Sequence, residues 1–360
     1  MKNSKLFSKF TIRNTTFRNR IVLSPMCQYK AKNGYVDDWH FQHYSRFAFS
    51  GLGGSFIEAT GVSPEGRITH GCTGIWEDNQ IDGLKRITDI FKDYNCVSGI
   101  QLAHAGRKAS FLRPWDGAKP IEVNEGIEKK WQTMGPSAIP VNDKSPTPIE
   151  MTKDDLDRVT FEFKNAAKRS LEAGFDILEV HGAHGYLLHS FFSPISNKRS
   201  DKYGGNLENR MRFGLQVVKN VREVWPLEKP LFFRISSIDG AENGSTIEEN
   251  IIYAKELKKV GVDFIDCSSG GIGGSPVLMK SKIIPGFQVP FAEKIKKEAN
   301  INTMAVGAII NFDQAEEIIS HERSDLVAIG RELLADPQWV YKAASFFDLP
   351  NAKEYLPESY

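Results

Sequence analysis

The densest group of polar side chains in the sequence is the segment HGAHGY, which contains His181, His184 and Tyr186. A neutral imidazole carries one N–H, so two histidines can together bind one oxygen atom on which negative charge develops. A phenol has a reference pKa of about 10 and can therefore donate a proton at neutral pH. Two other interpretations stay open here. His-x-x-His can chelate a metal, although no third ligand is evident, and both histidines can be loop residues with structural hydrogen bonds.

A buried cation and several glycines indicate a site for an anion. Arg234 lies in the apolar run LFFRIS, where a cation needs a carboxylate of the protein or an anionic cofactor as its partner. Gly307 and the pair Gly330–Arg331 follow two further apolar runs. Glycine lets a phosphate approach the backbone closely, and arginine adds charge-assisted hydrogen bonds.

The four cysteines are scattered and form no CxxC motif. This pattern fits a reducing, cytoplasmic location and offers no zinc or iron–sulfur ligand cluster, so we expect no metal. Cys27 lies close to the end of an apolar run, but a nucleophilic cysteine needs a base nearby, and a lone cysteine is more often a small buried apolar residue. We expect Cys72, Cys96 and Cys267 to pack in the core.

Eight short apolar runs must position these side chains. They are nearly continuous rather than alternating, which is typical of parallel strands covered on both faces, and each is followed by a helical pattern. The predicted strands are Ile21–Ser24, Ser55–Ala59, Val97–Leu102, Ile177–His181, Leu231–Ile235, Phe264–Cys267, Met304–Val306 and Leu326–Ile329.

This alternation predicts an α/β fold, specifically a (β/α)8 TIM barrel. The alternative, a doubly wound sheet, usually carries GxGxxG after its first strand, whereas here SPMCQY follows. In a barrel the functional residues lie at the carboxyl ends of the strands. That rule selects Ser24, Pro25, Met26, Cys27, Glu58, Ala59, Thr60, Gln101, His104, His181, His184, Tyr186, Arg234, Ser268, Ser269, Gly307, Gly330 and Arg331.

Other segments extend the barrel. Leu6–Phe17 alternates around Asn14–Thr15 and predicts an N-terminal hairpin that plugs the bottom of the barrel. Residues 107–150 are rich in proline, glycine and charge, so we expect a long loop insertion after strand 3, folded over the active-site face. Thr152 with Asp155 predicts the start of a helix, and Gly174 its end. We expect one domain, 1–360, with a C-terminal tail at 335–360.

Composition narrows the class of protein. Charged residues make up 25% and hydrophobic residues 41%, and the formal charge is 46 − 45 = +1, which argues against nucleic acid or an anionic membrane surface as a partner. No apolar run approaches the ~18 residues of a spanning helix. The N-terminus MKNSKLFSKF lacks the apolar stretch of a signal peptide.

Four motifs together resemble one known family. SPMCQY, QLAHAGRK, HGAHGYLLHSFFSPISNKRSDKYGGNLENR and IGRELLADP resemble the Old Yellow Enzyme family of FMN-dependent ene-reductases (NADH:flavin oxidoreductase/NADH oxidase), and the resemblance runs from about Leu6 to Leu334. The cysteine of SPMC is similar to that of the thermophilic-like branch, which includes NADPH dehydrogenases and xenobiotic reductases. The Gln28 of SPMCQY and the insertion near Trp115 and Trp131 lean towards the xenobiotic reductases.

The resemblance implies FMN as cofactor and assigns roles to the residues above. His181 and His184 would bind a substrate oxygen, Tyr186 would deliver a proton, and Tyr29 would line the substrate pocket. Cys27 would touch substrate and tune the flavin potential. Arg107 and Lys108 would border the flavin. The flavin ring would contact Ser24, Pro25, Met26, Cys27, Ala59, Gln101 and Arg234, and Gly307, Gly330 and Arg331 would hold its phosphate.

The implied reaction has two halves. NADPH, or NADH, donates a hydride to FMN; N5 of FMN then passes it to the C=C bond of an α,β-unsaturated carbonyl or nitro compound while Tyr186 adds the proton. A quinone or nitro-compound reductase is an alternative on the same site. A non-catalytic flavin-binding protein is another, but it would need neither Tyr186 nor both histidines.

The resemblance also implies a homodimer or higher homo-oligomer. In some relatives a C-terminal arginine enters the neighbouring active site, whereas this tail has none after Arg331. Tyr355 or Tyr360 are candidates to replace it.

Overall fold

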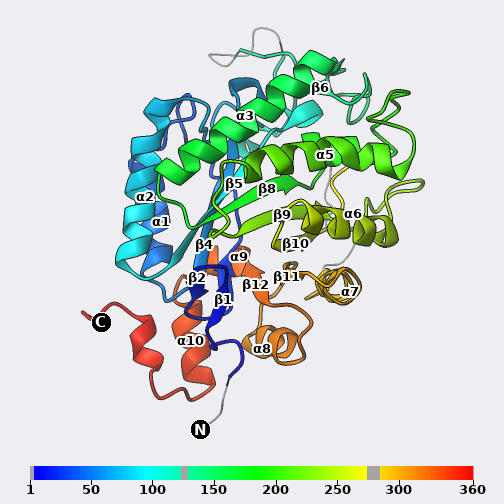
Figure 1. The fold of residues 1–360 in the computed structure, drawn as a ribbon. Helices are drawn as coiled ribbons and strands as arrows, with labels where there is room; N and C mark the ends of the chain where they lie inside the picture. Colours follow the sequence, from blue (N-terminus) through cyan, green and yellow to red (C-terminus); the bar gives the residue numbers. More distant parts are fainter. Residues whose placement is uncertain (1–3, 123–128, 274–283, 360) are drawn as a thin grey trace.

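Eight parallel strands close into a barrel, which confirms the predicted TIM barrel (Figure 1). The computed structural model describes residues 4–122, 129–273 and 284–359. Around the barrel, each strand pairs with the next in chain order, and the last pairs with the first. The strands are β3 (Ile21–Leu23), β4 (Gly54–Gly61), β5 (Val97–Ala103), β8 (Ile177–Gly182), β9 (Leu231–Ser236), β10 (Phe264–Ser268), β11 (Asn302–Ala305) and β12 (Leu326–Ile329).

An N-terminal hairpin closes one end of the barrel, as predicted. Its strands are β1 (Phe10–Ile12) and β2 (Thr15–Phe17), and Thr15 already pairs with Ile12, so the turn is at Arg13–Asn14, one residue earlier than expected. Phe17 belongs to the apolar cluster inside the barrel, and Phe10 packs edge-on against Phe264 with 5.9 Å between the ring centroids. The hairpin therefore buries apolar side chains that would otherwise face water.

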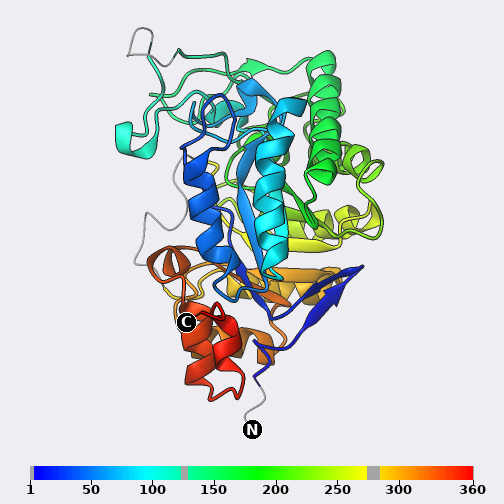
Figure 2. The same ribbon diagram turned by 90° about the vertical axis from the view of Figure 1, so that its left-hand side faces the viewer.

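Helices cover the outside of the barrel (Figures 1 and 2). The predicted helix between strands 3 and 4 starts at the capping box of Thr152 and Asp155 and ends just before Gly174, whose φ of +88° is the left-handed conformation that terminates helices. The helices that follow the strands in order are α1 (Asp38–Ala48), α2 (Ile81–Asp93), α3 (Lys153–Glu172), α5 (Leu207–Arg222), α6 (Ile247–Lys259), α7 (Val289–Ala299), α8 (Phe312–Ser320) and α9 (Arg331–Ala335), with α4 (Leu187–Phe192) before α5 and α10 (Trp339–Phe346) after α9.

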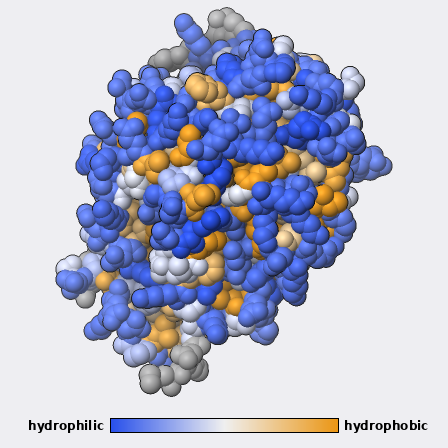
Figure 3. All heavy atoms as spheres, viewed as in Figure 1, coloured by the Kyte–Doolittle hydropathy of each residue, from blue (hydrophilic) through white to orange (hydrophobic). Residues whose placement is uncertain are grey.

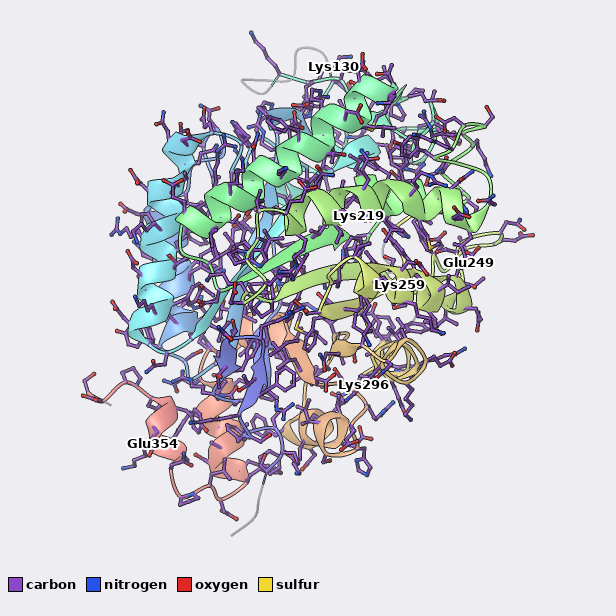
Figure 4. The ribbon with its side chains drawn as sticks, viewed as in Figure 1. Lys130, Lys219, Glu249, Lys259, Lys296 and Glu354 are labelled. Carbon is purple, nitrogen blue, oxygen red and sulfur yellow. The ribbon has the colours of Figure 1, made fainter. Side chains whose placement is uncertain are left out.

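The helices are amphipathic, so their polar faces form the surface. Lys219 on α5 and Lys259 on α6 point outward (Figure 4), whereas Val217 and Leu257 on the same helices are buried. The surface in this view is mostly hydrophilic, with small hydrophobic patches (Figure 3). Among the described residues, no helix is long and apolar enough to cross a membrane.

The insertion after β5 lies on the side of the barrel away from the hairpin (Figure 2). It contains the short parallel pair β6 (Met134–Gly135) and β7 (Ile149–Glu150). The guanidinium of Arg107 donates to the carbonyl oxygens of Ile139, Pro140 and Ile272, which ties the insertion to the loop after β10. The ring of Trp115 lies 6.3 Å from that of Tyr29, so the insertion reaches the residues that follow β3.

The tail packs on its own chain. Tyr355 is 8% exposed, and its ring lies 5.1 Å from that of Phe7. The side chain of Tyr355 is thus buried against the N-terminal segment of its own chain, which does not favour its entry into a neighbouring active site. Tyr360 lies outside the described residues.

Candidate active site

A cavity of about 690 Å³ opens at the carboxyl ends of the barrel strands, within the usual size of small-molecule sites. Fourteen of the residues assigned to flavin, substrate or catalysis line it, although they come from seven strands, whereas Arg107 and Lys108 do not. The fourteen are Ser24, Pro25, Met26, Cys27, Tyr29, Ala59, Gln101, His181, His184, Tyr186, Arg234, Gly307, Gly330 and Arg331.

The three polar rings of HGAHGY converge in this cavity. The ring centroid of His181 lies 5.1 Å from that of His184 and 5.0 Å from that of Tyr186. Nδ1 of His181 accepts the backbone N–H of Ala183 at 3.2 Å, which places the proton of this imidazole on Nε2. Burial, with a further contribution from Arg234, holds the pKa of both histidines well below the usual range. Both rings are therefore neutral, each with one N–H to donate.

The phenol and the thiol in the cavity keep their protons. Burial raises the pKa of Tyr186 far above its usual value, as it does for the Cys27 thiol. Cys27, followed by burial, raises the pKa of Tyr29. The ammonium nitrogen of Lys108 lies 5.2 Å from the centroid of the Tyr186 ring. The site therefore presents proton donors and no reactive anion from these three side chains.

Arg234 has a partner inside the barrel. Its Nε lies 2.9 Å from Oδ2 of Asp266 on the adjacent strand β10. A second carboxyl, Glu179, accepts from Nε2 of Gln101 at 2.7 Å, and burial together with Asp266 raises the pKa of Glu179. A protonated Glu179 leaves Arg234 and Asp266 as one compensated ion pair beneath the cavity.

The wall of the cavity that follows β11 and β12 is built from glycine and arginine. Gly307 has φ of +121°, and a Cβ there would lie 2.8 Å from Nε2 of Gln288; a Cβ at Gly330 would lie 3.1 Å from the sulfur of Met26. Arg331 is exposed and forms no ion pair with a carboxylate in the described part of the chain. The wall thus exposes backbone next to an uncompensated cation, which is an arrangement that suits a phosphate.

Some features of the site were missed or misassigned. Oγ of Ser268 lies 2.6 Å from Nε2 of His184. The sequence placed Ser268 at a strand end but did not predict this contact. Gln288 lines the cavity and bridges Ser269 and the carbonyl of Val306, and no motif marks it. Arg107 does not line the cavity, contrary to expectation, because its guanidinium is occupied by backbone carbonyls.

A family model described as the NADH:flavin oxidoreductase / NADH oxidase family matches residues 5–349. The chain belongs to this family, and the resemblance of its motifs is confirmed.

Curated relatives define the enzyme more closely. The chain is 48% identical over 341 residues to an NADPH dehydrogenase of Geobacillus sp. (strain WCH70), covering 94% of this chain and 93% of the relative. It is 46% identical to an NADPH dehydrogenase of Geobacillus thermodenitrificans (strain NG80-2), with 95% and 94% covered. The protein is thus an FMN-linked NADPH oxidoreductase of the Old Yellow Enzyme type, with FMN and a nicotinamide coenzyme as cofactors.

Solved structures share the barrel. Morphinone reductase superposes with a TM-score of 0.78 at 23% identity, covering 99% of this chain and 94% of that chain. The Old Yellow Enzyme homologue from Zymomonas mobilis gives 0.76 at 23% identity, with 98% and 96% covered. A 2-naphthoyl-CoA reductase complex gives 0.85 at 25% identity over 95% of this chain, which spans about half of that longer protein.

Proposed function

We propose that this enzyme is an ene-reductase, which reduces the C=C bond of α,β-unsaturated carbonyl or nitro compounds at the expense of NADPH. The observation that carries the proposal is the convergence of His181, His184 and Tyr186 in one cavity, as two neutral N–H donors and one protonated phenol. Activated alkenes need this set of groups, because reduction creates negative charge on the activating oxygen and requires a proton on carbon.

The cavity suits FMN on three counts. The wall of Gly307, Gly330 and Arg331 would hold the phosphate. Ser24, Pro25, Met26, Cys27, Ala59 and Gln101 would line the ring. Arg234, 6% exposed at the cavity floor, would stabilise negative charge on the reduced ring, because a cation in a low-dielectric site favours an adjacent anion.

When bound, FMN supplies the hydride chemistry, accepting a hydride from the coenzyme and passing it to the substrate. The chain's own residues would do the rest. His181 and His184 would bind the activating oxygen of the substrate and so withdraw electron density from the double bond. Ser268 would fix the orientation of the His184 ring through its contact with Nε2. Tyr186 would protonate the second carbon.

Cys27 and Tyr29 would shape the substrate side of the cavity. Both keep their protons, so neither is expected to act as a nucleophile, and Cys27 would instead contact substrate and tune the potential of the cofactor. The coenzyme would enter the same cavity and leave before the alkene binds, which predicts ping-pong kinetics. Morphinone reductase, solved in complex with tetrahydroNAD, is consistent with a nicotinamide site in this fold.

The test is the visible absorption spectrum of the purified protein before and after anaerobic NADPH, and then after 2-cyclohexenone. The yellow colour should bleach with NADPH and return with the enone. A protein that bleaches with NADPH but is not reoxidised by the enone would contradict the proposal. Quinones or nitro compounds would then be the candidate substrates of the same site.

Three further expectations stay predictions: a single domain over residues 1–360, a homodimer or higher homo-oligomer, and a cytoplasmic location.

A further inference from the structure

The backbone that carries His184 adopts an unusual conformation. His184 has φ of +61° and Gly185 has φ of +75°. A left-handed conformation is unfavourable for a residue with a side chain and persists where surrounding contacts hold it. The direction of the His184 ring therefore depends on whatever fixes this turn.

Among the described residues, three side chains form hydrogen bonds with the backbone of the turn. The N–H of His184 donates to Oγ of Ser236 at 2.9 Å, and Nζ of Lys108 donates to the carbonyl of His184 at 2.8 Å. The N–H of Gly185 donates to Nδ1 of His189 at 2.8 Å. His189 is 1% exposed, so no water replaces this acceptor if it is lost.

The opposite nitrogen of His189 is held by a carboxylate. Nε2 lies 2.8 Å from Oδ1 of Asp239, which is 3% exposed. The same carboxylate accepts the hydroxyl of Ser193 at 2.6 Å and both the N–H and the hydroxyl of Ser245 at 2.7 and 2.9 Å. Although burial opposes ionisation, the contact with His189, followed by the hydrogen bonds from Ser193 and Ser245, lowers the pKa of Asp239 to about 2.

An ionised carboxylate only accepts hydrogen bonds, so the proton of His189 must be on Nε2. Nδ1 is then left as an acceptor, which is what the N–H of Gly185 requires. The contact between Asp239 and His189 thus selects the tautomer that holds the turn.

We propose that His189 and Asp239 form a pair of positioning residues, which fixes the turn at His184–Gly185 and so directs the His184 imidazole toward the substrate oxygen. Neither residue lines the cavity, and both act through the backbone. The inference rests on the proposed function only in that His184 binds the substrate.

Asp239→Asn tests the pair without changing side-chain volume. The backbone N–H of Ser245 cannot turn, so the amide oxygen of the asparagine would face it and the NH₂ would face His189. Nε2 of His189 would then accept, its proton would move to Nδ1, and two N–H groups would face each other at Gly185. The same substitution reverses the histidine tautomer in serine protease triads.

Two measurements on the FMN-loaded enzyme report separately on the turn and on the binding of a substrate oxygen. Hydrogen exchange at the Gly185 amide reports the turn. Spectral titration with cyclohexanone, a ketone without a reducible C=C bond, reports oxygen binding by the histidines. Asp239→Asn should speed exchange at Gly185 and weaken cyclohexanone binding, each by about tenfold or more, since a buried N–H loses its acceptor. The dissociation constant of FMN should stay within about twofold.

Ser245→Ala is the matched control, because it removes one hydrogen bond to the same carboxylate but keeps the contact of Asp239 with His189. It should leave both measurements near wild type. His189→Asn, whose amide oxygen can accept from Gly185, should retain more binding than His189→Leu, which cannot.

Unchanged exchange at Gly185 in both Asp239→Asn and His189→Leu would overturn the inference, as would equal effects of Ser245→Ala and Asp239→Asn. If the wild-type enzyme neither binds cyclohexanone nor reduces enones, the proposed function fails, whereas exchange at Gly185 still decides whether the pair fixes the turn.

Discussion

Arg234 and Asp266 form an ion pair inside the barrel, with 2.9 Å between Nε and Oδ2. They lie opposite each other in the register of β9 and β10, and the side chain of Asp266 is fully buried. A buried ion pair is stable only where its geometry is good, because either charge alone would be costly to bury. The pair therefore supports the cavity floor, and Arg234 is the member of the pair that lines the cavity.

Arg234→Met should destabilise the FMN-saturated enzyme by about 3–5 kcal/mol, the usual result of leaving one buried charge without its partner. Urea unfolding followed by circular dichroism measures this loss. The double variant Arg234→Met/Asp266→Asn lacks the same contact with FMN but removes the orphaned carboxylate, so it should regain at least half of the stability. If the double variant is no more stable than the single one, the ion pair is not what the barrel depends on.

Tyr186→Phe should slow alkene reduction by about a hundredfold or more, because a positioned general acid contributes on this scale. Reduction of FMN by NADPH needs no proton from Tyr186 and should stay within a few-fold of wild type. Anaerobic stopped-flow spectroscopy measures the two half-reactions separately. An equal loss in both would show that Tyr186 shapes the cavity rather than donating the proton.

Glu58 should make the protein less stable as the pH rises. It is fully buried at a bulge in β4 and accepts the N–H of Gln28 at 2.8 Å, and burial raises its pKa to about 8 from the ordinary value of 4.5. Between these values the folded state holds a proton that the unfolded chain releases, so stability falls with rising pH.

From about pH 6.5 to about pH 8, this one group should cost about 1.5 kcal/mol of unfolding free energy. Glu58→Gln keeps an acceptor for Gln28 but cannot ionise. The change in its unfolding free energy between the two pH values should therefore be smaller by that amount, as measured by urea unfolding. Parallel pH profiles for the variant and the wild type would mean that Glu58 is ionised in the folded protein.

Thr152→Ala should cost about 1 kcal/mol of unfolding free energy, because the Thr152 hydroxyl accepts the N–H of Asp155 at the start of α3. Thr152→Ser keeps the hydroxyl and should lie within about 0.5 kcal/mol of wild type in the same urea titration. Thr152 does not line the cavity, so the enone reduction rate at room temperature should not change. A loss in Thr152→Ser as large as in Thr152→Ala would point to the methyl group instead.

The barrel and most of the cavity could be predicted from the order of the amino acids alone. Parallel strands buried on both faces are nearly continuous apolar runs, so segments such as Leu326–Ile329 are visible without a structure. A barrel brings all carboxyl strand ends to one face. Residues as distant as Ser24 and Arg331 could therefore be assigned to one site.

The partners of the polar groups, in contrast, could not be predicted before the folded chain was seen. Asp266 for Arg234, Ser268 for His184 and Asp239 for His189 join segments far apart in the chain. Spacing along a strand fixes which face a side chain occupies, but not which atom of a neighbouring strand or loop it meets. These contacts set charge, tautomer and ring direction, and they depend on packing and hydrogen-bond angles that exist only once the barrel has closed.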